Sequence, residues 1–303
     1  MKPHSALIAA GVVCALSFAA TAEAHAQTAI PDFYNGGLTW TSRQANVMPP
    51  MPGSPGARGP IGDHPRFPHY ANNSGRPPTL RIGNDVSPLL LPWAAAKTRE
   101  ANEKALAGAV PFTAANRCWP PGVPGILGFT AEPVLFLQTP TELTILYQRG
   151  QIIRRIHLNE KHPENLKPSW MGHSIGRYEG DTLVVDTIGL NDKTYMDNFP
   201  IPHSDQIHVI ERYRIVPGSP DLITDGPRPR DDERYYTNPT KQVLQVIATI
   251  EDQGAFTAPF SVMQLYEKLT EKDPFEESIC QQNSDDKLDQ GLVPVPTAAK
   301  ADF

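Results

Sequence analysis

Hydrophobic and polar residues alternate with a period of two through most of the chain between residues 132 and 267. Runs rich in Val, Ile, Leu, Thr and Tyr are separated by turn-forming residues, a pattern typical of β-strands with one buried face. The predicted strands are 132–138, 142–148, 151–158, 182–190, 206–216, 243–251 and 259–267.

The connections between these runs favour antiparallel pairing. Arg149-Gly150 and Gly180-Asp181 each provide a two-residue hairpin with a glycine for a positive φ. Because the pattern between the strands contains no helix of length, parallel βαβ units are excluded. The sequence predicts an all-β fold, an antiparallel meander forming a closed or nearly closed lipocalin-like barrel with a ligand-sized interior.

The chain outside the barrel domain, 118–280, divides into segments of different composition. Residues 27–90 form an arm rich in Pro and Gly, in which neither helix nor sheet can propagate. A helix is predicted over 91–110, since Pro92 suits its first turn and Gly108 its end. The tail, 281–303, is weakly patterned and predicted to be loose.

Residues 1–26 are typical of an export signal. Lys2 precedes an apolar run over 6–20, and Ala24-His25-Ala26 suits cleavage before Gln27. A periplasmic or secreted protein is predicted, the alternative being an uncleaved anchor. Removal of the signal leaves Cys118 and Cys280, which we expect to form a disulfide in an oxidising compartment, with two unpaired thiols as the alternative.

Charge restricts the class of partner. The net charge of -6 is spread along the chain without long acidic or basic blocks. Binding to nucleic acid or to an anionic membrane is therefore not expected, and no membrane span is expected after signal removal. A small-molecule ligand or substrate is the predicted partner.

Gly172-His173-Ser174-Ile175-Gly176 matches G-x-S-x-G, the nucleophile elbow of α/β-hydrolases. That motif requires a strand before it and a helix after it, and neither is predicted here. Asp186 or Asp192 followed by His203 would complete the formal order of a triad. A serine hydrolase remains the weaker alternative.

Histidines are concentrated in one third of the chain. His157, His162, His173, His203 and His208 lie there, but H-x-H and H-E-x-x-H patterns are absent. We therefore expect neither a metal nor another cofactor, with a metal site as the weaker alternative.

Two carboxylates interrupt apolar rows of predicted strands. Glu211 interrupts the odd-numbered row of the strand 206–216, and Asp186 interrupts the row of Val184 and Ile188. A carboxylate that faces a core must be paired, hydrogen-bonded or protonated. Arg155 on an earlier strand is the predicted partner, and the pair is either structural or part of an acid/base site in a lined cavity.

The run Pro168-Ser169-Trp170, Gly172 to Gly176 and Glu179-Gly180-Asp181-Thr182-Leu183-Val184-Val185-Asp186-Thr187, with Pro202-His203-Ser204 and Glu211-Arg212-Tyr213-Arg214, resembles an uncharacterised family of exported bacterial proteins. The resemblance covers about residues 118–280. It implies export, but it carries no activity, cofactor or catalytic residue to this chain.

Two classes of function fit these observations. The first is an exported enzyme, a lyase, isomerase or hydrolase, that acts on a small, partly apolar molecule by general acid/base chemistry. The second is a lipocalin-like binding protein in which the same groups only fix a ligand. The expected catalytic residues are His173, Asp186, His203 and Glu211; the expected substrate-binding residues are Trp170, Arg155 and Arg212.

Overall fold

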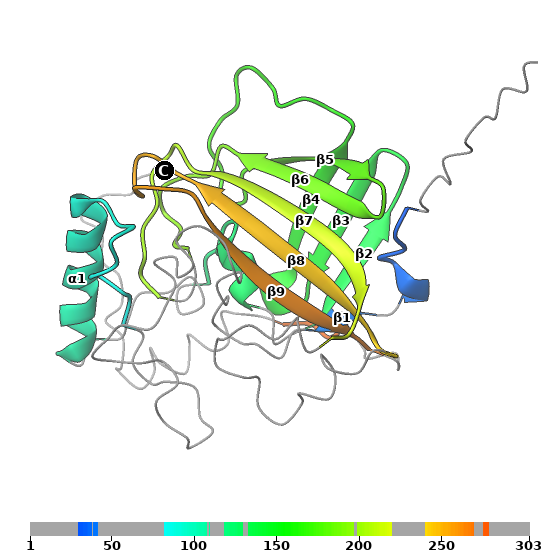
Figure 1. Ribbon diagram of the computed structural model, residues 1–303, viewed down its shortest axis with the longest axis horizontal. Coiled ribbons are helices and arrows are strands. Elements are labelled where there is room, and N and C mark those ends of the chain that lie inside the picture. Colours follow the sequence, from blue (N-terminus) through cyan, green and yellow to red (C-terminus); the bar gives the residue numbers. More distant parts are fainter. Residues whose placement is uncertain are drawn as a thin grey trace, which may run out of the picture.

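The computed structural model describes residues 30–37, 39–41, 82–107, 109, 118–129, 133–196, 199–219, 240–269 and 275–278. The predicted signal, the tail and most of the Pro/Gly-rich arm lie outside the described residues, and so does Cys280. Within the described residues, nine strands form a closed barrel, with β1 between β2 and β9 (Figure 1). The strands are β1 Trp40–Thr41, β2 Val134–Gln138, β3 Glu142–Tyr147, β4 Ile152–Leu158, β5 His173–Glu179, β6 Thr182–Ile188, β7 His208–Pro217, β8 Gln242–Glu251 and β9 Phe260–Lys268.

The fold confirms the predicted all-β, lipocalin-like barrel, and each predicted strand corresponds to an observed one. The pairing differs from a pure meander at one place. β4 and β5 run parallel, with Ile156 opposite Ser174, while the other neighbouring strands are antiparallel. The long loop between them, green in Figure 1, is the crossover that a parallel pair requires.

β5 was missed by the sequence pattern because its inward side is not apolar. Ser174 and Gly176 face the interior, where the serine hydroxyl is hydrogen-bonded and a Cβ on the glycine would lie 2.8 Å from Ile156 Cγ2. No strand was predicted over this stretch. The Gly180-Asp181 hairpin was right, and Gly180 has the expected positive φ of 62°.

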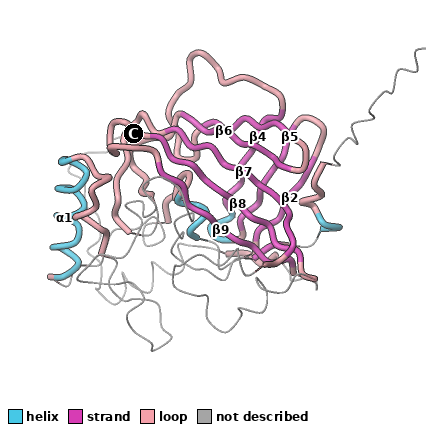
Figure 2. The backbone as a smooth tube through the Cα atoms, viewed as in Figure 1, coloured by secondary structure: helices cyan, strands magenta, loops and turns pink. Residues whose placement is uncertain are grey.

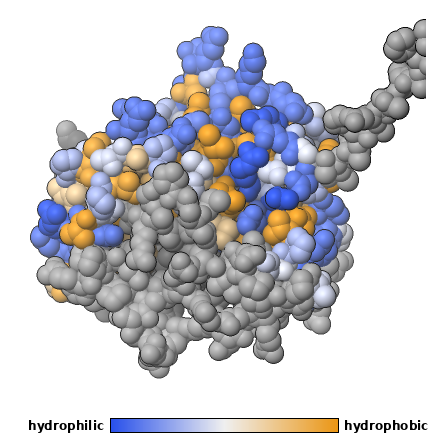
Figure 3. Space-filling view, viewed as in Figure 1, coloured by the Kyte–Doolittle hydropathy of each residue, from blue (hydrophilic) through white to orange (hydrophobic). Residues whose placement is uncertain are grey.

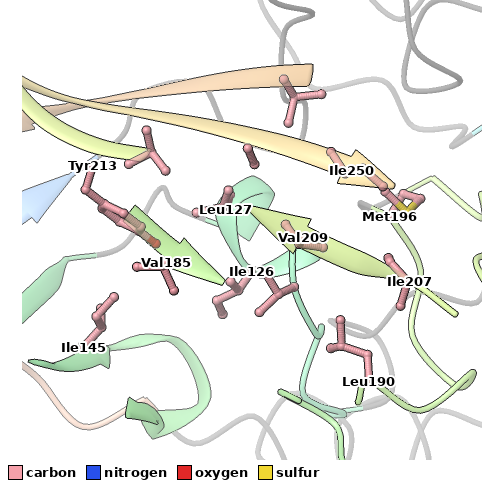
Figure 4. Packing of buried hydrophobic residues seen from close by; sticks show 14 of the residues in the cluster. Ile126, Leu127, Ile145, Val185, Leu190, Met196, Ile207, Val209, Tyr213 and Ile250 are labelled. Atoms are coloured by element: carbon pink, nitrogen blue, oxygen red, sulfur yellow. The ribbon is translucent and has the colours of Figure 1, made fainter. Parts of the chain in front are cut away.

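The interior of the barrel holds a large apolar core to which a 3-10 helix, η2 (Gly125–Phe129), contributes. Ile126 and Leu127 lie among Val185, Val209 and Ile250 (Figure 4). The side-chain amide of Gln264, on the inner face of β9, donates to Leu127 O over 3.0 Å. At this level the space between the strands is occupied by the protein's own side chains.

α1 (Pro92–Leu106) lies beside the barrel, and Pro92 occupies its first turn as predicted (Figure 2). Its buried side is formed by Ala94, Thr98, Asn102 and Ala105. Trp93 remains partly exposed, and its indole N–H donates to Gly254 O over 2.7 Å. Among the described residues, no helix has the length and apolar character needed to span a membrane.

The outer face of the barrel carries mostly polar side chains, as expected of a sheet with one face packed on the core. In Figure 3 hydrophilic residues dominate the visible surface around β5 and β6, with hydrophobic residues between them. Ion pairs lie on this face, including Arg214 with Asp181. A smaller buried apolar cluster of Val243, Met263 and Leu265 lies on the outer side of β8 and β9.

Candidate functional site

A row of titratable side chains crosses the outer face of the barrel at one end. His157 lies near the end of β4, His173 at the start of β5, Asp186 on β6, His208 at the start of β7 and Glu251 at the end of β8. Strand register brings them together, because His157 is opposite Ile175, Ile175 opposite Asp186, and His208 opposite Glu251. His162 reaches the row from the β4–β5 loop.

These groups form a continuous chain of short contacts. His162 Nδ1 lies 2.9 Å from His173 Nδ1, and His162 Nε2 lies 3.2 Å from Asp186 Oδ1. His208 Nε2 lies 2.9 Å from the same carboxylate oxygen, and His208 Nδ1 lies 3.4 Å from Glu251 Oε2. The side chains of His162, Asp186 and His208 are 17%, 29% and 30% exposed, so the chain is accessible from solvent but partly desolvated.

When the imidazoles are neutral, the acceptor role of Asp186 determines which ring nitrogens carry protons. A carboxylate only accepts, so His162 and His208 each donate from Nε2–H. A neutral His162 then has a lone pair on Nδ1, and His173 donates its Nδ1–H to it. His173 is left with an unprotonated Nε2, which makes no hydrogen bond among the described residues.

The environment of His173 favours its neutral form. Burial lowers its pKa, and the neighbouring imidazoles of His162 and His157 lower it further, while Glu160 acts in the opposite direction. The ring of His157 stacks on that of His173, with centroids 5.1 Å apart and planes 14° from parallel. A neutral imidazole with a free Nε2 and a hydrogen-bonded Nδ1–H is the form that accepts a proton in general base catalysis.

Trp170, close to His173 along the chain, contacts a second tryptophan from a distant segment. Trp170 and Trp119 contact each other, with ring centroids 5.0 Å apart and planes inclined by 59°. Lys193 Nζ lies 5.9 Å from the centroid of the Trp170 ring. Trp170 precedes His173 by three residues, which places the predicted substrate-binding tryptophan at the same end of β5 as the histidines.

Glu211, a predicted catalytic residue, lies elsewhere, inside the barrel with no exposed surface. Its partner is Arg154 and not the predicted Arg155: Arg154 Nη1 donates to Glu211 Oε1 over 2.9 Å, and Nη2 donates to Oε2. Tyr213 also donates to Glu211 Oε1, over 2.8 Å. Burial alone would lower the pKa of Arg154, but the charge of Glu211 raises it well above its usual value.

The interior network is complete in itself. Arg154 also donates to Ser174 Oγ and Thr187 Oγ1, which lie 2.9 Å apart. Burial raises the pKa of Tyr213 well above its usual value, and the charge of Glu211 raises it further, so its hydroxyl stays protonated and can donate. These contacts satisfy the buried charges, which makes the network a structural one.

Asp186 and Glu211 therefore do not share a lined cavity, and that expectation was wrong. Asp186 lies opposite Ile210, and Glu211 lies opposite Val185, so the two carboxylates are on opposite faces of neighbouring strands. Because Leu183, Val184 and Val185 are all apolar, the sequence of β6 does not show which residues face inward. Its inward row is Leu183, Val185 and Thr187, not the row that contains Asp186.

The remaining predicted site residues are separate from the histidine row. Arg155 and Arg212 lie on the outer face and pair with Glu142 and Glu179. His203 is 2% exposed: its Nδ1–H donates to Ser204 O over 2.8 Å, so its Nε2 accepts from the Thr194 hydroxyl over 2.6 Å. Burial lowers the pKa of His203. With both nitrogens bonded to the protein, His203 has a structural role.

His162, His208 and Glu251 belong to the site but were not among the predicted catalytic residues. The only sequence signal for them was the concentration of histidines, which does not reveal which ones share a face. Among the described residues, no group of three or more His, Cys, Asp or Glu is arranged to hold a metal ion.

Comparisons with models of protein families, with curated proteins and with solved structures found no match for this chain. The class of protein that fold and site define is thus a lipocalin-like barrel that carries a hydrogen-bonded histidine and carboxylate row on its outer face.

Proposed function

We propose that this protein is an exported enzyme that acts on a small, partly apolar molecule by acid/base chemistry, with His173 as the general base. The observation that carries this proposal is the chain from His173 through His162 to Asp186. An imidazole held in one tautomer by a second group, which a carboxylate holds in turn, is a recurring arrangement for proton transfer.

In the proposed reaction His173 Nε2 takes a proton from the substrate or from an attacking water. The imidazolium that forms donates its Nδ1–H to His162, whose Nε2–H is held by the Asp186 carboxylate. The negative charge of Asp186 stabilises this positive charge through His162. His173 then returns the proton to another substrate atom or to a leaving group, which restores its neutral form and accounts for an isomerase, a lyase or a hydrolase.

His208 would position the carboxylate. It donates to the oxygen of Asp186 that His162 also uses, and Glu251 lies on its other side. Two donors on one oxygen hold Asp186 in a single orientation, so His162 is held as well. These roles require only residues of this chain.

A second candidate function is binding of a small molecule without catalysis. The partly exposed pair of Trp119 and Trp170 favours it, because exposed indole rings are common in ligand sites. In that case the histidine row would only orient the ligand.

Proton transfer to and from carbon acids can be followed across a panel of candidate compounds. The full chain is incubated in D2O with small aromatic and aliphatic carbonyl compounds, and loss of C–H signals is followed by 1H NMR, while a parallel panel of esters tests hydrolysis. His173→Gln should lower the rate on any responsive compound by about 10²- to 10⁴-fold. Arg177→Gln, on the outer face of the same strand, is the matched control.

Melting temperatures of both variants should equal that of the unmodified protein, which separates chemistry from unfolding. A rate that is unchanged in His173→Gln would refute the role of His173. Ligand binding without turnover of any compound would favour the binding protein.

A further inference from the structure

The backbone on both sides of Trp170 is fixed near the start of β5. Ser169 forms a β-bridge with Leu190, and Ser169 N donates to Gly189 O over 2.9 Å. Gly172 has a φ of +67°, and a Cβ there would lie only 2.7 Å from Ile188 O, so the turn between Trp170 and His173 packs directly on the end of β6. Three residues span at most about 11 Å, which places the backbone of Trp170 within reach of one small ligand bound at His173.

A second segment supports the indole from another side. Trp119 contacts the Trp170 ring, and it belongs to a segment in which a Cβ on Gly122 would meet Thr194 Oγ1 at 2.7 Å. Trp119 is 40% exposed, so the pair presents aromatic surface to solvent. Aromatic surface fixed by its own backbone contacts loses little conformational entropy when a ligand binds.

Lys193 supplies a positive charge at the same place. Its ammonium lies 5.9 Å from the centroid of the Trp170 ring, its side chain is exposed, and among the described residues it forms no ion pair. An indole and an ammonium that forms no ion pair together complement a planar ring that carries a negative charge. The ring can stack on the indole, and the charge can pair with the ammonium.

We propose that Trp170 and Lys193 bind a small aromatic anion, of the aromatic carboxylate class, and present it to His173. This names a substrate class for the acid/base site and rests on the proposed function. The lysine disfavours cationic ligands, and an aliphatic anion loses the stacking contact. The aromatic class also agrees with a substrate that is partly apolar.

Binding can be measured independently of catalysis. The chain contains 4 tryptophans, so 15N-labelled full chain should give four indole N–H signals, and Trp170→Phe identifies that of Trp170. Benzoate is the probe. Its titration should shift the Trp170 signal, whereas Trp40, 1% exposed inside the barrel, is an internal control that should not move.

The contributions of the ion pair with Lys193 and of the ligand's aromatic ring to binding are tested separately. Lys193→Gln should weaken benzoate binding by about two- to fivefold, the range of an exposed ion pair. Lys167→Gln removes the same charge from an exposed lysine of the β4–β5 loop and should bind as the unmodified protein does. Benzamide, which lacks the charge, and cyclohexanecarboxylate, which lacks the ring, should both bind more weakly than benzoate.

Two results would overturn the proposal: a Trp170 signal that benzoate does not move, or equal benzoate affinity in Lys193→Gln and the unmodified protein. The variant His173→Gln distinguishes failure of this ligand proposal from failure of the proposed catalytic function. Benzoate should still bind to this variant, since His173 acts on the ligand and does not hold its ring or charge. Retained binding together with unchanged turnover in His173→Gln would refute the catalytic proposal alone.

Discussion

The Nδ1 atoms of His162 and His173 lie 2.9 Å apart, so one of the two imidazoles donates a proton to the other. For a neutral His162, Asp186 determines the direction, because it takes the Nε2–H and leaves Nδ1 as the acceptor. The free lone pair of the arrangement is thereby placed on His173 Nε2. Everything proposed for the reaction depends on this assignment.

Chemical modification tests the assignment directly. Diethyl pyrocarbonate acylates neutral imidazoles, and the lowered pKa of His173 keeps more of this residue neutral at pH 6 than of an ordinary histidine. We expect His173 to be among the fast-reacting histidines at pH 6, as measured by mass spectrometry of peptides. His203, also with a lowered pKa but buried, is the control and should remain unmodified. Slow modification of His173 that accelerates only above pH 7 would contradict the neutral assignment.

The buried ion pair should matter for stability. Glu211→Gln keeps the shape of the side chain but leaves the charge of Arg154 unpaired in the interior, which typically costs about 3–5 kcal/mol of the free energy of unfolding. Urea denaturation measures this change. Glu179→Gln, at an ion pair on the surface, should change stability by about 1 kcal/mol or less. Equal free energies of unfolding in the two variants would contradict a structural role of Glu211.

The free energy of unfolding should decrease when the pH falls below about 6.5, the ordinary pKa of a histidine side chain. Burial lowers the pKa of both His173 and His203 in the folded chain. Below pH 6.5 the unfolded chain therefore binds more protons than the folded one, and unfolding becomes more favourable as the pH falls through the folded pKa values. Melting temperatures at pH 7.5, 6.5 and 5.5 test this, and His203→Gln should show a smaller dependence. A melting temperature that rises as the pH falls to 5.5 would contradict the predicted loss of stability.

Ser174 should not act as a nucleophile. Its hydroxyl is 3% exposed, faces the interior and is bonded to Arg154 and Thr187. A fluorophosphonate should leave the folded protein unlabelled at this position, as measured by intact mass. Stoichiometric labelling of Ser174 would restore the serine hydrolase alternative.

The predicted export and the Cys118–Cys280 disulfide stay predictions, because Cys280 and the signal lie outside the described residues. Exported material should begin near Gln27, and its mass should increase by two hydrogens on reduction. Cys280→Ser should abolish that increase. A retained Met1 would exclude cleavage, and an unchanged mass on reduction would exclude the bridge.

The barrel was predictable because period-two alternation is a local signal. Glu211 was correctly placed on the inner face, since the apolar row around it, Val209 and Tyr213, continues on both sides. Asp186 was misplaced because Leu183, Val184 and Val185 are all apolar, and alternation has no contrast in such a run. Arg155 was chosen over Arg154 although the two differ only in the face they occupy, which strand register decides and local sequence does not.

The site was less predictable than the fold, because it too depends on strand register, which local sequence does not determine. His173 and Asp186 could be identified as chemically capable, but their connection runs through His162, a loop residue whose position depends on the parallel crossover between β4 and β5. Hydrogen bonds between residues distant in the chain have no signature in a single sequence. The histidine row therefore forms only when five strands, β4 to β8, are in register.

β1 consists of two residues, Trp40 and Thr41, and it closes the barrel by pairing with β2 on one side and with the late strand β9 on the other. Trp40 can pair with Lys268 only after β9 has been synthesised, so closure of the barrel joins distant parts of the chain. Until then the edges of β2 and β9 are unpaired, which is the condition under which strands associate with other chains. Before closure, the seam at Trp40 and Thr41 is therefore where the barrel is exposed to association with other chains.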